Sequence, residues 1–404
     1  MMNTRRHLVL FTNAFPTSFS QENYLIEEIA FLSKAFERVI IVPIEKESVK
    51  HSLPANVEVT WLNNQAPLNF FTKFWYLLKH SSLLVKESKA YGFGFRDLKV
   101  LAQELLVAKF YAEGITKLLS KHNLNMKDTL FYNYWCNTFT LSLALLKRRE
   151  PELKFVSRGH QADVYFQAEQ KVRTSFYVTK LQALHKLFVI SEHGANYLSK
   201  RYPFFSLKIT KAYLGVKDRR ENPFKTQDYF TIVSVSKLGD NKRVFAIPEI
   251  LNHLDFNVKW VHFGSSGPED VKKVVMAANK LRPNIHFEMK GLIPNDQILQ
   301  YYQNTTVNLF INVSIVEGLS FAAIEALSFG IPMILTETNG APELIRDNGY
   351  TIPVNYAAAS VASLIKAMKG RNEKILRNNS RALFLERFDA TKNYNDFVFK
   401  GLLS

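Results

Sequence analysis

Two glutamates stand in the otherwise apolar stretch 316–335, whose sequence is VEGLSFAAIEALSFGIPMIL. The preceding run 307–314 is typical of a buried strand, and residues 321–329 have the composition of a helix that the next glycine ends. We therefore predict that Glu317 lies in the turn after the strand and that Glu325 lies about one turn into the helix.

The start of this helix suits a phosphate group. Ser320 is the predicted N-cap, and a helix N-terminus offers unpaired N–H groups and a partial positive charge. A carboxylate accepts hydrogen bonds from two neighbouring hydroxyls, so Glu317 and Glu325 suit a sugar diol at one end of a diphosphate and a ribose diol at the other. The spacing therefore predicts a nucleotide-sugar site.

The segment from Glu317 to Ile345, EGLSFAAIEALSFGIPMILTETNGAPELI, resembles the donor-binding motif of retaining GT-B glycosyltransferases, in particular family 4. The resemblance implies that Glu317 contacts donor-sugar hydroxyls and that Glu325 holds the ribose. It also implies main-chain contacts to sugar and phosphate from Gly318, Leu319, Ser320 and Phe321. The family usually has an aromatic-glycine pair where this chain has Leu319 and Ser320, which leaves the sugar open.

A basic loop is the second candidate. The segment IVSVSKLGDNKRV (232–244) occupies the place where the family carries a basic residue and a lysine about five apart that neutralise the diphosphate. Lys237 and Lys242 match these positions. The family usually has Arg at the first, and Lys is a point charge without the bidentate fork, so Arg243 is a further candidate. A solvated basic loop is the alternative.

The first half of the chain carries a candidate histidine. FVSRGHQADVY (155–165) resembles an "SRxHGxD" segment of bacterial members, which implies that His160 points toward donor sugar and phosphate. A hydrogen-bonded structural histidine at a strand end is the alternative.

Two loops complete the candidate site. In the loop 13–23, NAFPTSFSQEN, where relatives have a Gly-Gly pair, Ser20 and Gln21 offer polar contacts to donor or acceptor, with helix capping by Ser20 as the alternative. The loop GLIPN (291–295) resembles one that lines the base, implying main-chain contact from Leu292 or Ile293.

Composition fits a large folded protein with an anionic partner. The 404 residues carry a formal charge of +16, and 47% are hydrophobic. No Lys/Arg tract or zinc-finger spacing favours nucleic acid, so phosphorylated substrates or a membrane face are expected. Cys136 is the one cysteine, no apolar run reaches the length of a membrane span, and the start of the chain lacks the core of a signal peptide. We expect a cytoplasmic protein.

Strand-like runs alternate with helical patterns through the whole chain, which predicts an α/β protein with two Rossmann-like parallel-sheet domains. With the resemblance, this is a GT-B fold whose domains face each other across a cleft that holds the ligand. We predict an N-terminal acceptor-side domain over residues 1–216, onto which a C-terminal helix at about 386–404 packs back. A linker at 217–228 and a nucleotide-sugar domain at 229–385 complete the predicted organisation.

Residues 69–99 interleave aromatic side chains with lysines. Two interpretations stay open: an amphipathic helix at an anionic membrane face, or a core helix with solvated lysines. The first would place the protein peripherally on the inner face of the cytoplasmic membrane, with an acceptor carried on a lipid.

The resemblance implies a retaining transferase of hexosyl or N-acetylhexosaminyl groups. We expect it to use a nucleotide-sugar donor, most simply a UDP-sugar, and a lipid-linked, oligosaccharide or polysaccharide acceptor in bacterial cell-surface glycan synthesis. Neither an Asp-x-Asp pair nor a His/Cys cluster with metal spacing occurs, so neither a metal nor another cofactor is expected. The alternatives are an epimerase or phosphorylase on the same frame, or a non-catalytic partner subunit.

Overall fold

The computed structural model describes residues 6–17, 22, 24–62, 69–91, 94–166, 174–370 and 373–403. The chain forms two compact units. The first comprises Met1–Ala212 together with Asn395–Ser404, and the second comprises Tyr213–Tyr394.

The first unit is built on a seven-stranded sheet with the order β3-β2-β1-β4-β5-β6-β7, in which every neighbouring pair is parallel. Its central strands are almost wholly buried because helices cover a parallel sheet on both faces. The strands are β1 (His7–Thr12), β2 (Arg38–Pro43), β3 (Val57–Val59), β4 (Thr129–Asn133), β5 (Lys154–Gly159), β6 (Lys186–Val189) and β7 (Ile209–Lys211).

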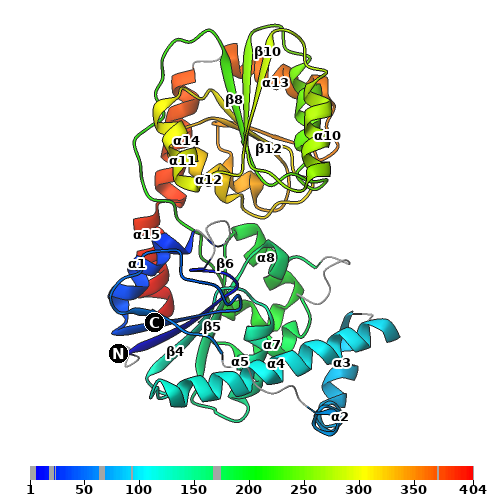
Figure 1. Cartoon of the computed structure of the whole chain (residues 1–404), viewed down its shortest axis with the longest axis vertical. Coiled ribbons are helices and arrows are strands. Elements are labelled where there is room, and N and C mark those ends of the chain that lie inside the picture. Colours follow the sequence, from blue (N-terminus) through cyan, green and yellow to red (C-terminus); the bar gives the residue numbers. More distant parts are fainter. Residues whose placement is uncertain are drawn as a thin grey trace. The chain divides into compact units, whose positions relative to one another are not determined.

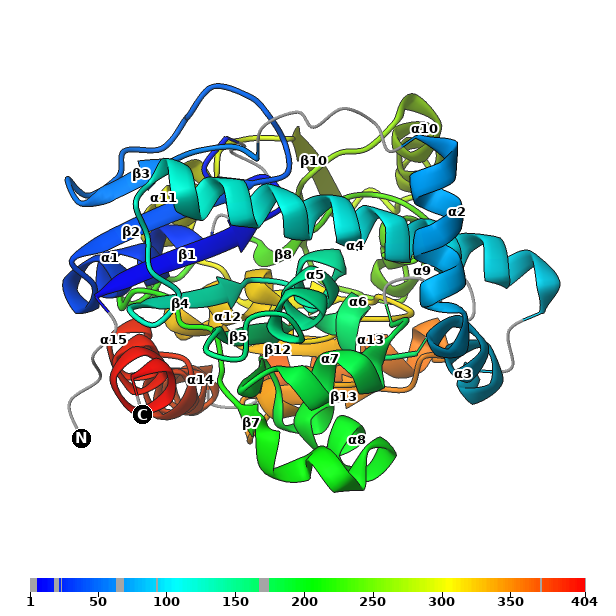
Figure 2. The ribbon, with the colours of Figure 1, turned by 90° about the horizontal axis from the view of Figure 1, so that it is seen from below.

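The helices of this unit include the long α4, which packs along α5 in Figure 1, and the pair α2 and α3, which contact α4. Their bounds are α1 (Leu25–Ala35), α2 (Phe70–Lys79), α3 (Ser81–Tyr91), α4 (Phe95–Lys121), α5 (Thr138–Lys147), α6 (Gln161–Val164), α7 (Tyr177–Ala183), α8 (Glu192–Arg201) and a 3₁₀ helix, Pro203–Lys208. The view of Figure 2 shows α2 crossing one end of α4.

The second unit has a six-stranded sheet, also parallel throughout, with the order β10-β9-β8-β11-β12-β13. Its strands are β8 (Phe230–Val235), β9 (Val258–Phe263), β10 (Ile285–Gly291), β11 (Leu309–Asn312), β12 (Met333–Thr336) and β13 (Gly349–Ile352). Its helices are α9 (Ile247–Leu251), α10 (Pro268–Ala278), α11 (Asn295–Asn304), α12 (Phe321–Ser328), α13 (Ala358–Gly370), α14 (Glu373–Arg387) and α15 (Ala390–Asn395), with 3₁₀ turns at Val244–Ala246 and Ala341–Leu344.

The prediction of two Rossmann-like parallel sheets is confirmed, because both strand orders run outward from a central strand, first to one side and then to the other. The sequence missed three strands: β3, β7 and β13. Each is three or four residues long and lies at the edge of its sheet, where one side of the strand has no neighbouring strand and the apolar pattern is weak.

The end of the chain returns to the first unit as a π-helical turn, Asp396–Leu402, which contacts α1. Phe397 packs against the ring of Tyr132, and the guanidinium of Arg158 lies 4.1 Å from the centre of the Phe397 ring. The returning segment therefore completes the buried interior of the first unit.

Candidate functional site

The turn and helix predicted around the two glutamates are present. β11 ends at Asn312, and α12 begins at Phe321 with Ser320 as its N-cap; the Ser320 hydroxyl accepts the Ala323 N–H at 3.4 Å. Glu317 lies in the turn and Glu325 lies about one turn into the helix, as the sequence predicted.

Glu317 meets Lys242 from the basic loop after β8. The Lys242 ammonium group donates to the Glu317 carboxylate, to which the Ser314 hydroxyl also donates at 3.3 Å. The Lys242 and Glu317 side chains are 26% and 15% exposed, so the pair is open to solvent on one side. The structure thus brings together two site residues that are 75 positions apart in the sequence.

Asn241 connects the two loops that carry Lys242 and Glu317. Its side chain accepts the Val316 N–H at 3.0 Å and donates to the Val316 carbonyl at 3.1 Å, while its own carbonyl accepts the Ile315 N–H at 2.7 Å. Three hydrogen bonds from one residue fix the spacing between the basic loop and the turn before α12.

The other basic candidates differ in their surroundings. Lys237 is exposed in the loop after β8. Arg243, which has a left-handed backbone conformation, donates to the carbonyls of Val313 and Val354, both at 2.8 Å, and its guanidinium lies over the Tyr356 ring. Arg243 therefore supports the loop, and Lys237 is the most exposed of the three cations.

Glu325 is buried, with a side-chain amide as its hydrogen-bond donor. The Asn295 Nδ2 group donates to Glu325 Oε1 at 2.7 Å, and only 5% of Glu325 is exposed. Burial raises the pKa of Glu325 to about 7, against the lowering effects of the Asn295 hydrogen bond and of Arg219. A buried carboxylate with a single short donor can still accept hydroxyl groups from a ligand.

The remaining predicted contacts of the second unit lie in two loops. Gly318 and Leu319 are buried in the turn, and the Gly318 carbonyl accepts the Gly340 N–H at 3.1 Å. In the loop after β10, Leu292 is 70% exposed and Ile293 is half-buried, just before the Asn295 that reaches Glu325. The loop 291–295, to which the resemblance gives the base, is therefore hydrogen-bonded to Glu325, to which it gives the ribose.

His160 lies in the first unit at the end of β5. Its Nε2 atom is 3.1 Å from the Tyr134 carbonyl, and its ring packs on Trp135 with the ring centres 4.3 Å apart. Burial, with a smaller effect of Arg158, lowers the pKa of His160 to about 3, so the imidazole is neutral at physiological pH. A neutral ring bound in this way has the contacts expected of a structural histidine at a strand end.

The neighbours of His160 in the "SRxHGxD" segment are also buried. Arg158 forms an ion pair with Glu28 at 3.0 Å, with both side chains wholly buried, and it donates to the Tyr132 hydroxyl at 2.8 Å. The Asp163 carboxylate accepts the Cys136 N–H at 3.2 Å. These two charges hold the interior of the first unit together.

The loop after β1 is bound to the carboxylate of Glu22, which was not among the predicted site residues. Glu22 accepts the N–H groups of Asn13, Ala14 and Phe15 at 2.7 to 3.0 Å, and the indole of Trp135 donates to it as well. These amides therefore already have an anionic acceptor within the chain. Ser20 and Gln21 lie outside the described residues.

Sequence reasoning thus missed Asn241, Asn295 and Glu22. Their types gave only a weak signal: each stands next to a predicted site residue or loop, but an Asn or Glu in a loop is usually solvated. In the part of the chain that the structure describes, no group of three or more His, Cys, Asp or Glu side chains is placed to hold a metal ion.

The fold defines the class. The structure of Anabaena Alr3699/HepE in complex with UDP superposes on the chain with a TM-score of 0.63 and 14% sequence identity, covering 98% of this chain and 99% of that one. The two parallel sheets, with this neighbour, identify the GT-B glycosyltransferase fold.

The second unit matches a sequence family. Residues 216–383 match the family model described as "Glycosyl transferases group 1", and they include Lys242, Glu317 and Glu325. The chain is 27% identical over 137 residues to one component of the human phosphatidylinositol N-acetylglucosaminyltransferase, covering 32% of this chain and 27% of that protein. It is 25% identical over 181 residues to the amylovoran biosynthesis glycosyltransferase AmsK of Erwinia amylovora, covering 42% and 44%. The matched part spans less than half of either relative.

Proposed function

We propose that the protein is a retaining family 4 glycosyltransferase that moves a hexosyl or N-acetylhexosaminyl group from a UDP-sugar. Its acceptor is a lipid-linked or polysaccharide glycan of a bacterial cell surface. The observation that carries this proposal is the contact of Lys242 with Glu317 beside the N-terminus of α12, inside the stretch that matches the family model. The UDP bound to Alr3699/HepE and the amylovoran role of AmsK support the choice of donor and acceptor class.

In the proposed mechanism the bond between the anomeric carbon and the diphosphate oxygen breaks, and an acceptor hydroxyl oxygen bonds to that carbon on the same face. Negative charge develops on the leaving UDP, which takes up the proton of the acceptor hydroxyl. Lys242, Lys237 and the N–H groups at the start of α12 stabilise that charge, which is the main catalytic contribution of such a site. Lys242 turns from Glu317 toward the diphosphate when the donor binds. The Glu317 carboxylate is then released to accept hydrogen bonds from the sugar hydroxyls.

Further residues of the second unit orient the donor. Glu325 accepts the ribose hydroxyls, and the exposed Leu292 and half-buried Ile293 lie in the loop proposed to line the base. The role of His160 at the donor sugar stays a prediction from the sequence; its ring is a neutral imidazole in the first unit, with its Nε2 atom at the Tyr134 carbonyl. No side chain is assigned as a covalent nucleophile, and no metal is required by the proposal.

A panel of UDP-, GDP-, ADP- and dTDP-sugars, tested by thermal shift, examines the donor site. A ligand at 100 times its dissociation constant stabilises the protein by about 2.7 kcal/mol, and we expect UDP-sugars to give the largest shift. Glu325→Ala should remove that shift. A larger shift with another base would contradict the UDP assignment.

Product analysis by NMR then separates transfer from its alternatives. Transfer to an acceptor with retained anomeric configuration is expected. An isomer of the sugar returned without any acceptor would instead indicate an epimerase. Neither transfer nor hydrolysis, together with a rise in the activity of an added transferase, would indicate a non-catalytic subunit.

A further inference from the structure

Helix α2 directs its largest apolar side chains away from the protein. At about 100° per residue, these side chains fall within an arc of about 140° on one side of the helix. They are Phe70, Phe71, Phe74, Trp75 and Leu78, exposed by 74%, 72%, 51%, 64% and 51%. We call them the aromatic face. No residue of α2 is buried, which is unusual for a helix so rich in aromatic side chains.

Other side chains of α2 attach it to the domain. Tyr76 and Leu77 pack against a buried cluster formed by α3, α4 and α5, and the ammonium group of Lys109 lies 5.3 Å from the centre of the Tyr76 ring. The Asn69 side chain caps the helix by accepting the Thr72 N–H at 2.8 Å. With its inner side bound, α2 cannot bury the aromatic face in its own domain, so that face is available to a partner.

The charges around this face are positive. From 69 to 91 the chain carries four lysines, at 73, 79, 86 and 89, and all four are exposed. The one acidic residue in this stretch, Glu87, is buried and accepts the Phe176 N–H. On the helix, Lys73 and Lys79 flank the aromatic face on its two sides, from which long side chains can reach headgroups while the rings enter the acyl region.

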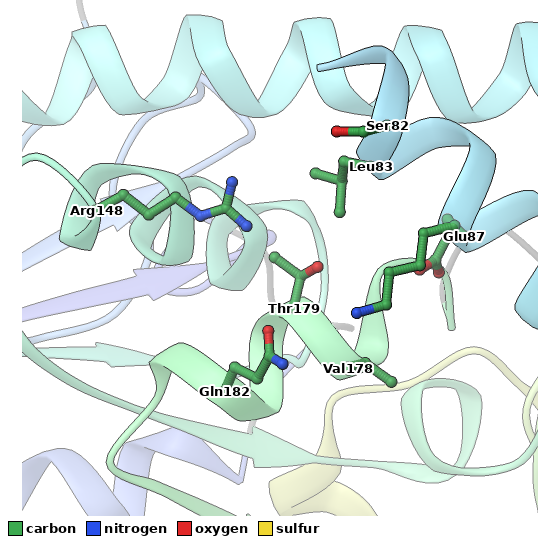
Figure 3. A pocket seen from close by; sticks show the side chains of 8 residues that line it. Ser82, Leu83, Glu87, Arg148, Val178, Thr179 and Gln182 are labelled. Atoms are coloured by element: carbon green, nitrogen blue, oxygen red, sulfur yellow. The ribbon is translucent and has the colours of Figure 1, made fainter. Parts of the chain in front are cut away.

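A cavity begins three residues beyond the end of α2. It has a volume of about 260 Å³ and lies between α3, α5 and α7. Figure 3 shows Arg148, at the end of α5, on one side and Glu87 on the other. Lys86 also lines it, so two exposed cations and one buried acid border the cavity. The cavity thus adds Arg148 to the exposed cations of this part of the first unit.

The combination of residues favours a lipid surface over a protein partner. Protein interfaces are enriched in aromatic residues but depleted in lysine, and lysines next to exposed aromatic rings are typical of helices that lie in a membrane interface. The whole chain has a formal charge of +16, which attracts an anionic surface over a longer range. Among the described residues, no helix has the length and apolar character needed to span a bilayer.

We propose that the aromatic face of α2 inserts into the interface of an anionic lipid bilayer, with Lys73, Lys79, Lys86 and Arg148 binding the headgroups. The inference goes beyond the proposed sugar transfer and does not depend on it. Of the two interpretations that the sequence left open for 69–99, the proposal adopts the membrane-facing one for α2.

Vesicle co-sedimentation in the absence of nucleotide-sugar tests the proposal. The full chain should bind vesicles of phosphatidylcholine mixed with phosphatidylglycerol more tightly than vesicles of phosphatidylcholine alone. Phe71→Ser combined with Trp75→Ser should weaken binding about a hundredfold, because each buried aromatic side chain contributes roughly one order of magnitude. Both side chains are exposed, so circular dichroism and thermal unfolding should be unchanged.

The matched control removes the same kind of surface elsewhere in the first unit. Phe204 and Leu207 are each 96% exposed in the 3₁₀ helix Pro203–Lys208, and Phe204→Ser with Leu207→Ser should bind vesicles like the unaltered chain. Lys86→Gln and Arg148→Gln should each weaken binding to anionic vesicles about fivefold. Trp75→Phe should retain binding but lose the blue shift of tryptophan emission that vesicles induce.

Three outcomes would overturn the proposal. The first is unchanged vesicle binding by the α2 double variant. The second is equal binding of the full chain to vesicles with and without phosphatidylglycerol. The third is a dimer in solution that the α2 double variant dissociates, with no vesicle binding at all, which would assign the face to a second copy of the chain. Donor binding, measured by thermal shift, stays a separate readout in every case.

Discussion

The two units each contain an acid paired with a base, and the two pairs differ in their surroundings. In the first unit, Glu28 and Arg158 are wholly buried, and Arg158 is further bound by the Tyr132 hydroxyl and the Ala212 carbonyl. In the second unit, Glu317 and Lys242 are partly exposed at the loops beside α12. A charge whose every donor is used inside the protein stabilises the fold, whereas a pair open to solvent can exchange partners with a ligand.

The same contrast separates Glu22 from Glu325. Glu22 takes three backbone N–H groups and an indole N–H, so its acceptor capacity is used within the chain. Glu325 has the Asn295 amide as its donor, which leaves the carboxylate with unused acceptor capacity. Burial raises its pKa to about 7. Burial alone does not distinguish a structural acid from a binding acid, but the number of its donors does.

The largest effect on stability is expected from Glu28→Gln. The substitution leaves the buried Arg158 without a counter-charge, and breaking such a pair costs about 3–5 kcal/mol of unfolding free energy. Glu47→Gln, which breaks the exposed pair with Lys50, is the control and should cost less than about 1 kcal/mol. Urea unfolding measures both, and equal costs would remove the contrast between buried and exposed pairs.

Lys242→Met should have a small effect on stability and a large effect on activity. We expect at most about 1 kcal/mol of lost stability, because the pair is partly solvated. The kcat of sugar transfer should fall about 10²–10³-fold, since a cation at the leaving diphosphate is lost. Lys273→Met, which removes the exposed partner of Asp240 in the same loop, should leave kcat unchanged. A large loss of stability with normal turnover would make Lys242 a structural residue like Arg158.

A smaller effect, which depends on pH, is expected from Glu325→Gln in the ligand-free protein. The folded-state pKa of Glu325 is raised from 4.5 to about 7, so the folded state loses stability as pH rises through this range, and the ionised carboxylate costs at most about 3 kcal/mol above pH 7. Glutamine should therefore stabilise the protein at pH 8 and much less at pH 5. UDP should bind the variant about tenfold or more weakly. Equal stabilisation at both pH values would contradict the raised pKa.

Much of the fold was visible in the sequence. Buried parallel strands such as RVIIVP and FTIVSV are short apolar runs between helical patterns, and their alternation specifies two parallel sheets. The edge strands β3, β7 and β13 were missed because they are short and partly polar. The turn and helix around Ser320 could also be predicted, because N-cap and glycine signals are local.

The partners of the site residues could not be predicted. Nothing local indicates that Asn241 bonds to Val316, or that Asn295 meets Glu325 thirty positions later. The amphipathic pattern of 69–99 was equally compatible with a core helix. Its exposure depends on which side of α2 packs against α4 and its neighbours, and that is a property of the folded domain.

The sequence by itself determined the class of fold, the position of the helix that carries Glu325, and which residues are chemically able to bind a diphosphate and hydroxyls. These depend on patterns spanning a few turns or one strand. Only the tertiary structure decided that Lys242 pairs with Glu317, that Arg158 forms a buried ion pair with Glu28, and that the aromatic face of α2 is exposed. Each of these outcomes is set by contacts between segments far apart in the chain, and local periodicity carries no information about them.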